Sequence, residues 1–389
     1  MSFSPDTSLQ SDPAGKSERA RLEKPTLTYP FDAPPATGHS IEVAPGVMWM
    51  RMPMGGKLDH VNVWAIKDDT HEGGGNGWAV VDSGMHTEQT VAAWQAQFAA
   101  ATAKNEGHSR LTRVLITHMH PDHVGMAGWL VQKFGCRLWM TQLEYLNCRV
   151  LVADTGREAP PDALQFYQRA GWSAEAMAVY KTRFGNFGKR IFELPQSYRR
   201  VVDGDLFQIG QHEWRVVVGT GHSPEHACYY CPALNVLISG DQVLPRISSN
   251  VSVHPTEPDS NPMLDWLTSI DKIKREVPDS VLVLPSHHDC FRGLHARLDY
   301  LAASQLRTID RLRKSLREPK RAVDVFTSLF GRAIDPTDGG LLHLATGESL
   351  ACLNYLWHRG EVSRTDDSEG VAWYQLLKDE VTAVGRQRT

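Results

Sequence analysis

The sequence has little of several features that would assign it to other protein classes. Its 389 residues include only six cysteines, which lack the spacing of a disulfide framework. No apolar stretch approaches the length of a membrane span, and the N-terminus lacks the positive-then-apolar pattern of a signal peptide. We therefore expect a cytoplasmic protein with reduced thiols and no membrane partner. The lone Cys228-x-x-Cys231 pair is interpreted as two buried thiols rather than a redox motif.

An excess of positive charge is also missing. The formal net charge is -4, which argues against a general nucleic-acid-binding surface. No Gly-x-Ser-x-Gly nucleophile elbow occurs, so we expect no serine nucleophile of that kind. What the chain does have is 41% hydrophobic residues over a length that can bury a large core and that predicts two domains.

Four potential metal ligands directly follow one short apolar run. Residues 114–116 read Val-Leu-Ile, typical of a buried strand, and His118, His120, Asp122 and His123 come just after it. Histidine binds zinc or iron through a neutral ring nitrogen, and aspartate binds a hard metal through oxygen. His118 and His120 point the same way if the strand pairing continues, so both can hold one ion. Asp122 and His123 lie beyond a proline, where the chain turns, and can reach a second ion.

Three further candidate ligands occupy the same kind of position. Each follows an apolar run, at the place where a buried strand presents residues to one edge of a sheet. Because the arrangement recurs, chance placement in a polar loop is a poor explanation, and a metal centre is predicted. These ligands are His222 after residues 216–218, Asp241 after residues 236–238 and His287 after residues 281–284.

The combined pattern resembles the metallo-β-lactamase superfamily of dinuclear hydrolases. The resemblance rests on His118-x-His120-x-Asp122-His123 with His222, Asp241 and His287, and it covers residues 40–295. Asp82 in Asp82-Ser83-Gly84 matches the upstream Asp-x-Gly of that family. The resemblance implies an α+β fold, an αββα sandwich of two mixed sheets with helices outside and the metals at one edge.

The resemblance also implies a role for each of these residues. His287 is the expected ligand rather than the adjacent His288, because Pro285-Ser286-His287 aligns with the family's ligand position. A supporting acid orients one ligand histidine, as is usual for a metal-bound imidazole. The implied assignment is His118, His120 and His222 for the first ion, Asp122, His123 and His287 for the second, Asp241 as the bridge and Asp82 as the supporting acid.

Composition divides the chain into three parts. Residues 1–38 are rich in serine, proline, aspartate and lysine, and we expect a disordered or arm-like tail. Residues 39–295 carry the complete motif set and are the expected catalytic domain. Within them, residues 141–195 mix aromatic and basic side chains in a helical insertion. This insertion is either a substrate-binding lid or a packed pair of peripheral helices whose aromatic side chains belong to the core.

Residues 296–389 have a different pattern. Apolar spacing predicts helices over residues 297–317, 321–330 and 347–358, and two short strands follow at the end. This order resembles the winged-helix domain appended to one branch of the superfamily. The third helix carries no arginine or lysine, although base reading in a DNA groove needs them. We therefore interpret the module as a structural appendage, or as one that forms a homodimer.

Three residues are candidates for contact with substrate. Arg246 lies five residues beyond Asp241. Its guanidinium could clamp a carboxylate or phosphate with two parallel hydrogen bonds, or could instead form a structural salt bridge. Asn62 and Trp64 come from a strand that we expect to end near the same rim.

The predicted chemistry is metal-assisted hydrolysis. Two divalent ions, expected to be zinc with iron or manganese as alternatives, lower the pKa of a bridging water and present hydroxide at neutral pH. Asp122 is placed to orient that hydroxide and then to carry a proton to the leaving group. The expected partner is a small-molecule ester or thioester, such as an acyl-CoA or a glutathione-type conjugate. The resemblance leaves endoribonuclease or phosphodiesterase, lactonase and iron-dependent sulfur dioxygenase activities as alternatives.

Overall fold

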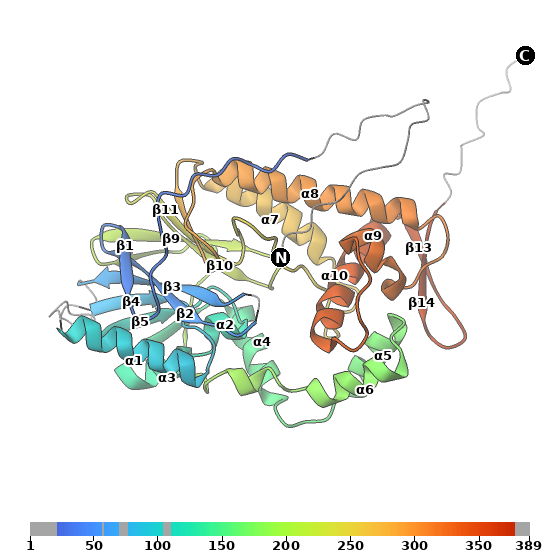
Figure 1. Cartoon of the computed structure of the whole chain (residues 1–389), viewed down its shortest axis with the longest axis horizontal. Coiled ribbons are helices and arrows are strands. Elements are labelled where there is room, and N and C mark those ends of the chain that lie inside the picture. Colours follow the sequence, from blue (N-terminus) through green and yellow to red (C-terminus); the bar gives the residue numbers. More distant parts are fainter. Residues whose placement is uncertain (1–21, 57, 70–76, 104–109, 378–389) are drawn as a thin grey trace, which may run out of the picture.

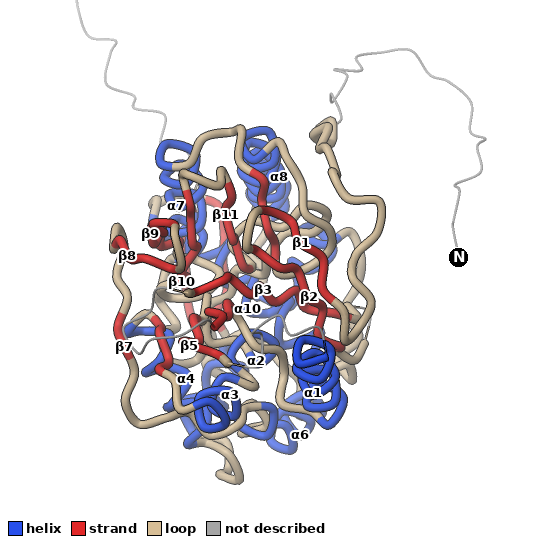
Figure 2. The backbone as a smooth tube through the Cα atoms, turned by 90° about the vertical axis from the view of Figure 1, so that its left-hand side faces the viewer, coloured by secondary structure: helices blue, strands red, loops and turns tan. Residues whose placement is uncertain are grey.

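Two mixed β-sheets lie face to face, with helices on both outer sides (Figure 1, Figure 2). The computed structural model describes residues 22–377, apart from residue 57, residues 70–76 and residues 104–109. The predicted α+β sandwich is confirmed. The first 21 residues of the predicted tail lie outside the described residues, so most of that prediction stays open.

The first sheet contains seven strands in the order β1-β2-β3-β4-β5-β6-β7. Neighbours from β1 to β4 are antiparallel, and those from β4 to β7 are parallel. The strands are β1 (Ser40–Ala44), β2 (Val47–Pro53), β3 (His60–Asp68), β4 (Gly77–Val81), β5 (Leu111–Leu115), β6 (Arg137–Met140) and β7 (Arg199–Arg200).

The second sheet contains five strands in the order β12-β11-β10-β9-β8. Only the β11–β12 pair is parallel. Strands β9, β11 and β12 contain continuous runs of valine, leucine or isoleucine, because both faces of the sheet are covered there and alternation with polar residues is lost. The five strands are β8 (Leu206–Ile209), β9 (His212–Gly219), β10 (His226–Cys231), β11 (Val236–Gly240) and β12 (Leu282–Pro285).

Helices cover the outer faces of both sheets. α1 and α3 pack on the first sheet. α7 packs on the second sheet, and α8 packs against α7. None of the helices in the described part of the chain is long and apolar enough to cross a membrane. The helices are α1 (Glu88–Ala103), α2 (Pro121–Val124), α3 (Ala127–Phe134), α4 (Gln142–Ala153), α5 (Pro161–Arg169), α6 (Ala174–Arg183), α7 (Pro262–Glu276), α8 (Leu294–Ser315), α9 (Phe326–Phe330) and α10 (Gly339–His358), with 3-10 turns at Gly188–Arg190 and Ala322–Val325.

Aromatic side chains dominate the layer between the two sheets. Trp49 and Trp64 stack there with their ring centroids 6.1 Å apart, and Trp214 and Tyr229 come from the facing sheet. All four are almost completely buried. Large apolar rings of this kind remove much surface from water and hold the two sheets together.

The C-terminal elements share one hydrophobic cluster with the catalytic part. This cluster runs from Trp266 of α7 through Leu298 of α8 to Leu353 of α10. The order of three helices followed by two antiparallel strands, β13 (Val362–Asp366) and β14 (Ala372–Leu376), is as expected. The winged-helix assignment and the domain boundaries stay predictions.

The helical insertion packs against these C-terminal elements. Phe166, Tyr167 and Trp172 are buried in the shared cluster. Trp172 donates through its indole N–H to the hydroxyl of Thr346 on α10, at 2.9 Å. The aromatic side chains are thus core residues, which favours the packed-helix alternative over a lid.

One predicted helix begins earlier than expected. The pattern predicted a start at residue 347, but α10 begins at Gly339, where the side chain of Asp338 accepts a hydrogen bond from the backbone N–H of Leu341. Glycines at 339 and 340 hid the first two turns, because glycine is a poor helix former.

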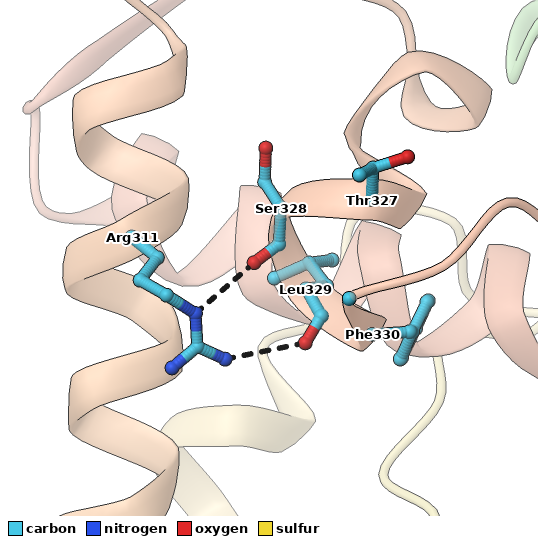
Figure 3. Close-up of a pocket in the computed structure, with 6 residues that line it drawn as sticks. Arg311, Thr327, Ser328, Leu329 and Phe330 are labelled. Atoms are coloured by element: carbon cyan, nitrogen blue, oxygen red, sulfur yellow. Dashed lines mark hydrogen bonds between the residues drawn. The ribbon is translucent and has the colours of Figure 1, made fainter. Parts of the chain in front are cut away.

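The basic residues of α8 are partly structural. Arg311 donates through its guanidinium to the carbonyls of Ser328 and Leu329 near the end of α9, at 3.2 and 3.3 Å (Figure 3). The pocket beside it is lined by residues of the C-terminal part only, and it contains no candidate metal ligand.

Candidate metal centre

One group of four candidate ligands converges beyond the ends of β5, β9 and β11. The Nε2 atom of His118 lies 2.8 Å from Nδ1 of His120 and 3.3 Å from Nε2 of His222. Asp241 closes the group, with Oδ2 placed 3.3 Å from Nε2 of His222. All four donor atoms lie within 4.8 Å of one another.

A second group lies directly beside the first. The Oδ2 atom of Asp122 is 3.4 Å from Nε2 of His123 and 3.4 Å from Nε2 of His287. Asp241 reaches this group too, because its Oδ1 lies 3.6 Å from Nε2 of His123 and 3.3 Å from Nε2 of His287. The structure therefore brings all seven predicted ligands together, with the Asp241 carboxylate between the two groups.

The donor set fits divalent cations. Zinc binds histidine nitrogen at about 2.0–2.1 Å, so two nitrogens on one tetrahedral ion lie about 3.3 Å apart, close to the separations seen here. The Nε2 atom of His123 is buried and has no hydrogen-bond partner among the described residues. Burial also lowers the pKa of His120 to about 3, which keeps its ring in the neutral form that binds metals.

Asp82 supports His123 from behind. Its Oδ2 lies 2.7 Å from Nδ1 of His123, and its carboxylate also accepts hydrogen bonds from the backbone N–H and the hydroxyl of Thr117. The backbone of Asp82 has a positive φ of 63°. A carboxylate that holds one nitrogen of a ligand imidazole leaves the other nitrogen free for a metal.

Glu144 is a supporting residue that the sequence analysis missed. Its buried carboxylate accepts hydrogen bonds from the backbone N–H groups of Met119 and Glu225, at 2.9 and 2.8 Å. Met119 lies between His118 and His120, and Glu225 lies three residues after His222. One carboxylate at the start of α4 therefore links the two loops of the first group, and a lone acid in a helical pattern gave no signal of this.

His226 is a second residue that was missed. Its ring stacks on that of His118 at 4.8 Å, and its Nε2 accepts a hydrogen bond from the backbone N–H of Asp241 at 3.1 Å. Gly240 has a φ of 49°, and a Cβ there would come within 2.5 Å of this ring nitrogen. The glycine therefore lets the histidine approach and fix the start of the Asp241 loop. The signal available was a histidine inside a short apolar strand.

Two of the predicted substrate contacts are not at the surface. Asn62 is completely buried, and its amide bonds Trp49, Arg51 and two backbone carbonyls of the loop around His287. Trp64 is 1% exposed and stacks on Trp49. Both residues support the site through packing, and neither side chain is presented to a ligand.

Arg246 is exposed but already has partners. Its guanidinium pairs with Asp289 at 2.9 Å and lies over the ring of Tyr29 at 5.4 Å. This arrangement agrees with the second interpretation of Arg246 given above, a structural salt bridge rather than a clamp on substrate. Its role toward substrate stays a prediction.

Comparison with known proteins identifies the family. Residues 56–315 match the family model described as metallo-beta-lactamase superfamily, and residues 309–377 match that described as metallo-beta-lactamase-like, C-terminal domain. The crystal structure of a beta-lactamase domain protein from Burkholderia ambifaria is 37% identical and covers 90% of this chain and 98% of its own, with a TM-score of 0.80.

Curated relatives are more distant. A probable metallo-hydrolase of Bacillus subtilis is 22% identical over 73% of this chain and 85% of its own length. An atrochrysone carboxyl ACP thioesterase of Aspergillus fumigatus is 24% identical over 62% of this chain, which spans 44% of that protein. The chain therefore belongs to the metallo-beta-lactamase superfamily.

Proposed function

We propose that this protein is a hydrolase that binds two divalent metal ions, zinc in the first instance, and cleaves small-molecule carboxylic thioesters or esters. The observation that carries the proposal is the position of Asp241, whose two carboxylate oxygens face separate groups of imidazole nitrogens. A single ion would leave one of these groups without a partner. Two ions bound there would acidify a water molecule and polarise the acyl oxygen.

The chain's own residues complete the chemistry. Burial alone would raise the pKa of Asp122, but the neighbouring His123 and His287 outweigh burial and hold that pKa well below its usual range. The carboxylate is therefore ionised at neutral pH. It can accept a proton from the attacking water and deliver it to the departing thiolate or alkoxide.

The names of curated relatives support an acyl substrate. Curated relatives from Aspergillus fumigatus and Emericella nidulans carry the name of a carboxyl ACP thioesterase, although they match this chain at 24% and 23% identity.

The test is thiol release from a panel of acyl-CoA, glutathione and N-acetylcysteamine thioesters. Protein stripped with a chelator should be inactive, and restoring two zinc ions per chain should restore turnover. If fully loaded protein releases no thiol from any of these compounds, the thioester proposal fails, and lactones and phosphodiesters become the next substrates to assay.

A further inference from the structure

His288 has an unusual backbone conformation beside the metal centre. In the described part of the chain, the residues other than glycine with positive φ are Asp82, Asn235 and His288, at 63°, 52° and 66°. This region is disfavoured for a residue with a Cβ and is normally taken by glycine. A residue with a side chain that adopts this backbone conformation needs other interactions to offset its cost.

The side chains of Asp82 and Asn235 form such interactions. Asp82 bonds Thr117 and His123, as described above. Asn235 donates from its amide to the carbonyl of Ser280 at 2.9 Å, and its amide oxygen accepts from the hydroxyl of the same residue at 3.2 Å. Both side chains therefore form hydrogen bonds within the fold that can offset the cost of this backbone conformation.

The backbone of His288 is held firmly by the first sheet. Its N–H donates to Nε2 of His60 at 3.0 Å, and its carbonyl accepts from Arg51 at 2.9 Å and from Asn62 at 2.8 Å. Since Nε2 of His60 accepts, its Nδ1 carries the proton and donates to Asp59 at 2.6 Å. Both polar groups of the strained residue are thus satisfied by β2 and β3.

The residue after it is held as well. Asp289 accepts from Arg51 at 3.0 Å and from Arg246 at 2.9 Å, on its two carboxylate oxygens. The turn from His287 to Asp289 therefore has a fixed shape before any ligand binds.

The imidazole ring of His288 is not held by hydrogen bonds in the way that its backbone is. Its Nε2 is buried and has no hydrogen-bond partner among the described residues, while the residue as a whole keeps partial contact with solvent. The ring lies edge-to-face with that of His60 at 6.2 Å, and His60 lies 6.4 Å from His287 in the same manner. His60 therefore contacts both the unbonded ring of His288 and the ring of His287, which belongs to the second group of ligands.

We propose that His288 is a substrate-contacting residue, whose ring donates a hydrogen bond to an oxygen of the molecule bound at the second group of ligands. Strained backbone that persists beside a reactive centre is a sign of function, and a fixed turn with an unbonded polar side chain is preorganised for a ligand. A buried polar atom without a partner also calls for one. This inference rests on the proposed metal centre, but not on the choice of a thioester as substrate.

The experiment compares His288→Gly with the wild type and with Asn235→Gly. Glycine relieves the backbone strain at both positions. Each protein is loaded with two zinc ions per chain, and its affinity for inorganic phosphate, a tetrahedral oxyanion, is measured by calorimetry. We expect His288→Gly to keep both ions, to melt at or above the wild-type temperature and to bind phosphate at least tenfold more weakly. Asn235→Gly should melt lower and bind phosphate as the wild type does.

His288→Asn provides a second measurement, because asparagine tolerates this conformation and retains a polar group. We expect its phosphate affinity to lie between those of the wild type and His288→Gly. Equal phosphate affinity in His288→Gly and wild type would overturn the proposal, as would a lowered melting temperature with unchanged affinity or a zinc-loaded wild type that binds no phosphate. Failure of the thioester panel with a positive phosphate result would reject the proposed substrate and leave the role of His288 standing.

Discussion

The Nδ1 atom of His222 lies 2.7 Å from the backbone carbonyl oxygen of Asn250. Because that nitrogen donates to the carbonyl, Nε2 remains free to face Asp241 and the other imidazoles of the first group. The side-chain amide of Asn250 in turn donates to Glu348 of α10 at 3.1 Å. The backbone N–H of Val253 bonds the carbonyl of Gly347, also on α10, at 3.0 Å. The C-terminal part of the chain thus holds the loop that orients a candidate metal ligand.

Removal of His222 should empty one of the two groups selectively. His222→Ala takes away the imidazole that joins His118, His120 and Asp241, while Asp122, His123 and His287 keep their positions. We expect the metal content to fall from two ions per chain to one, measured by elemental analysis of protein dialysed against low zinc. A count that stays at two would show that His222 does not hold an ion.

Loss of the Glu348 carboxylate should weaken metal binding by the first group of ligands, although Glu348 is not itself a candidate ligand. Glu348→Ala frees Asn250, and we expect the weaker support of His222 to lower the affinity of the first ion by about tenfold, as is typical for residues that orient metal ligands. The second ion should be unaffected. Glu348→Gln retains an acceptor for Asn250 and should behave almost as wild type. Chelator competition measures both affinities, and an equal fall in both would mean that the change is a general loss of structure.

Glu348 should also make stability depend on pH. Burial raises the pKa of its carboxyl from 4.5 to about 7, against the smaller opposite effect of the hydrogen bond from Asn250. The protonated form is therefore favoured by folding, and its stabilisation is complete below pH 4.5 and lost as the pH rises through 7. Relative to Glu348→Gln, the free energy of unfolding of the metal-free wild type should fall by about 1–3 kcal/mol between pH 5 and pH 8. Urea denaturation at several pH values measures this difference, which would be constant if Glu348 did not titrate.

Glu144 should contribute strongly to folding. Its carboxylate accepts from the backbone N–H groups of Met119 and Glu225, two residues that lie outside strands and helices. Removing a charged acceptor leaves buried donors unsatisfied, so Glu144→Ala should lower the free energy of unfolding by about 3 kcal/mol. Glu144→Gln keeps one acceptor oxygen and should lose about half of that. Denaturant titration provides the measurement, and a loss below about 0.5 kcal/mol would contradict the linking role.

Asp122 is expected to matter more for turnover than for folding. Asp122→Asn preserves the size of the side chain and one oxygen, so most of the metal should remain bound. Its amide cannot accept and deliver the proton, and we expect turnover to fall by about 10²–10⁴-fold. Steady-state assays on protein of known metal content test this. Unchanged turnover would exclude Asp122 from proton transfer.

Local sequence was sufficient to predict which candidate ligands lie together. The histidines at 118 and 120, the Asp-His pair that follows and the three later ligands each come just after an apolar run, and the structure places all of them beyond strand ends. Their meeting could be predicted because the direction and the end of a strand are local properties, and residues beyond neighbouring strand ends share one edge.

The supporting residues could not be predicted in the same way. Glu144 and Glu348 look like ordinary helix residues in the sequence, and each bonds a segment about 80 to 100 residues away. Asn62 was expected at the rim because its strand ends nearby, yet it is buried, since both faces of the first sheet are covered. Periodicity along one strand does not show which other segments lie over it.

The sequence by itself determined which atoms can bind metal, because histidine and aspartate at strand ends carry that chemistry wherever the strands meet. The tertiary structure alone decided how those atoms are held: a carbonyl behind His222, a carboxylate behind His123 and a fixed turn that leaves the ring of His288 unbonded. These contacts join segments far apart in the chain. They exist only after the two sheets and the C-terminal helices have packed, since packing is what sets the distance and angle of each hydrogen bond.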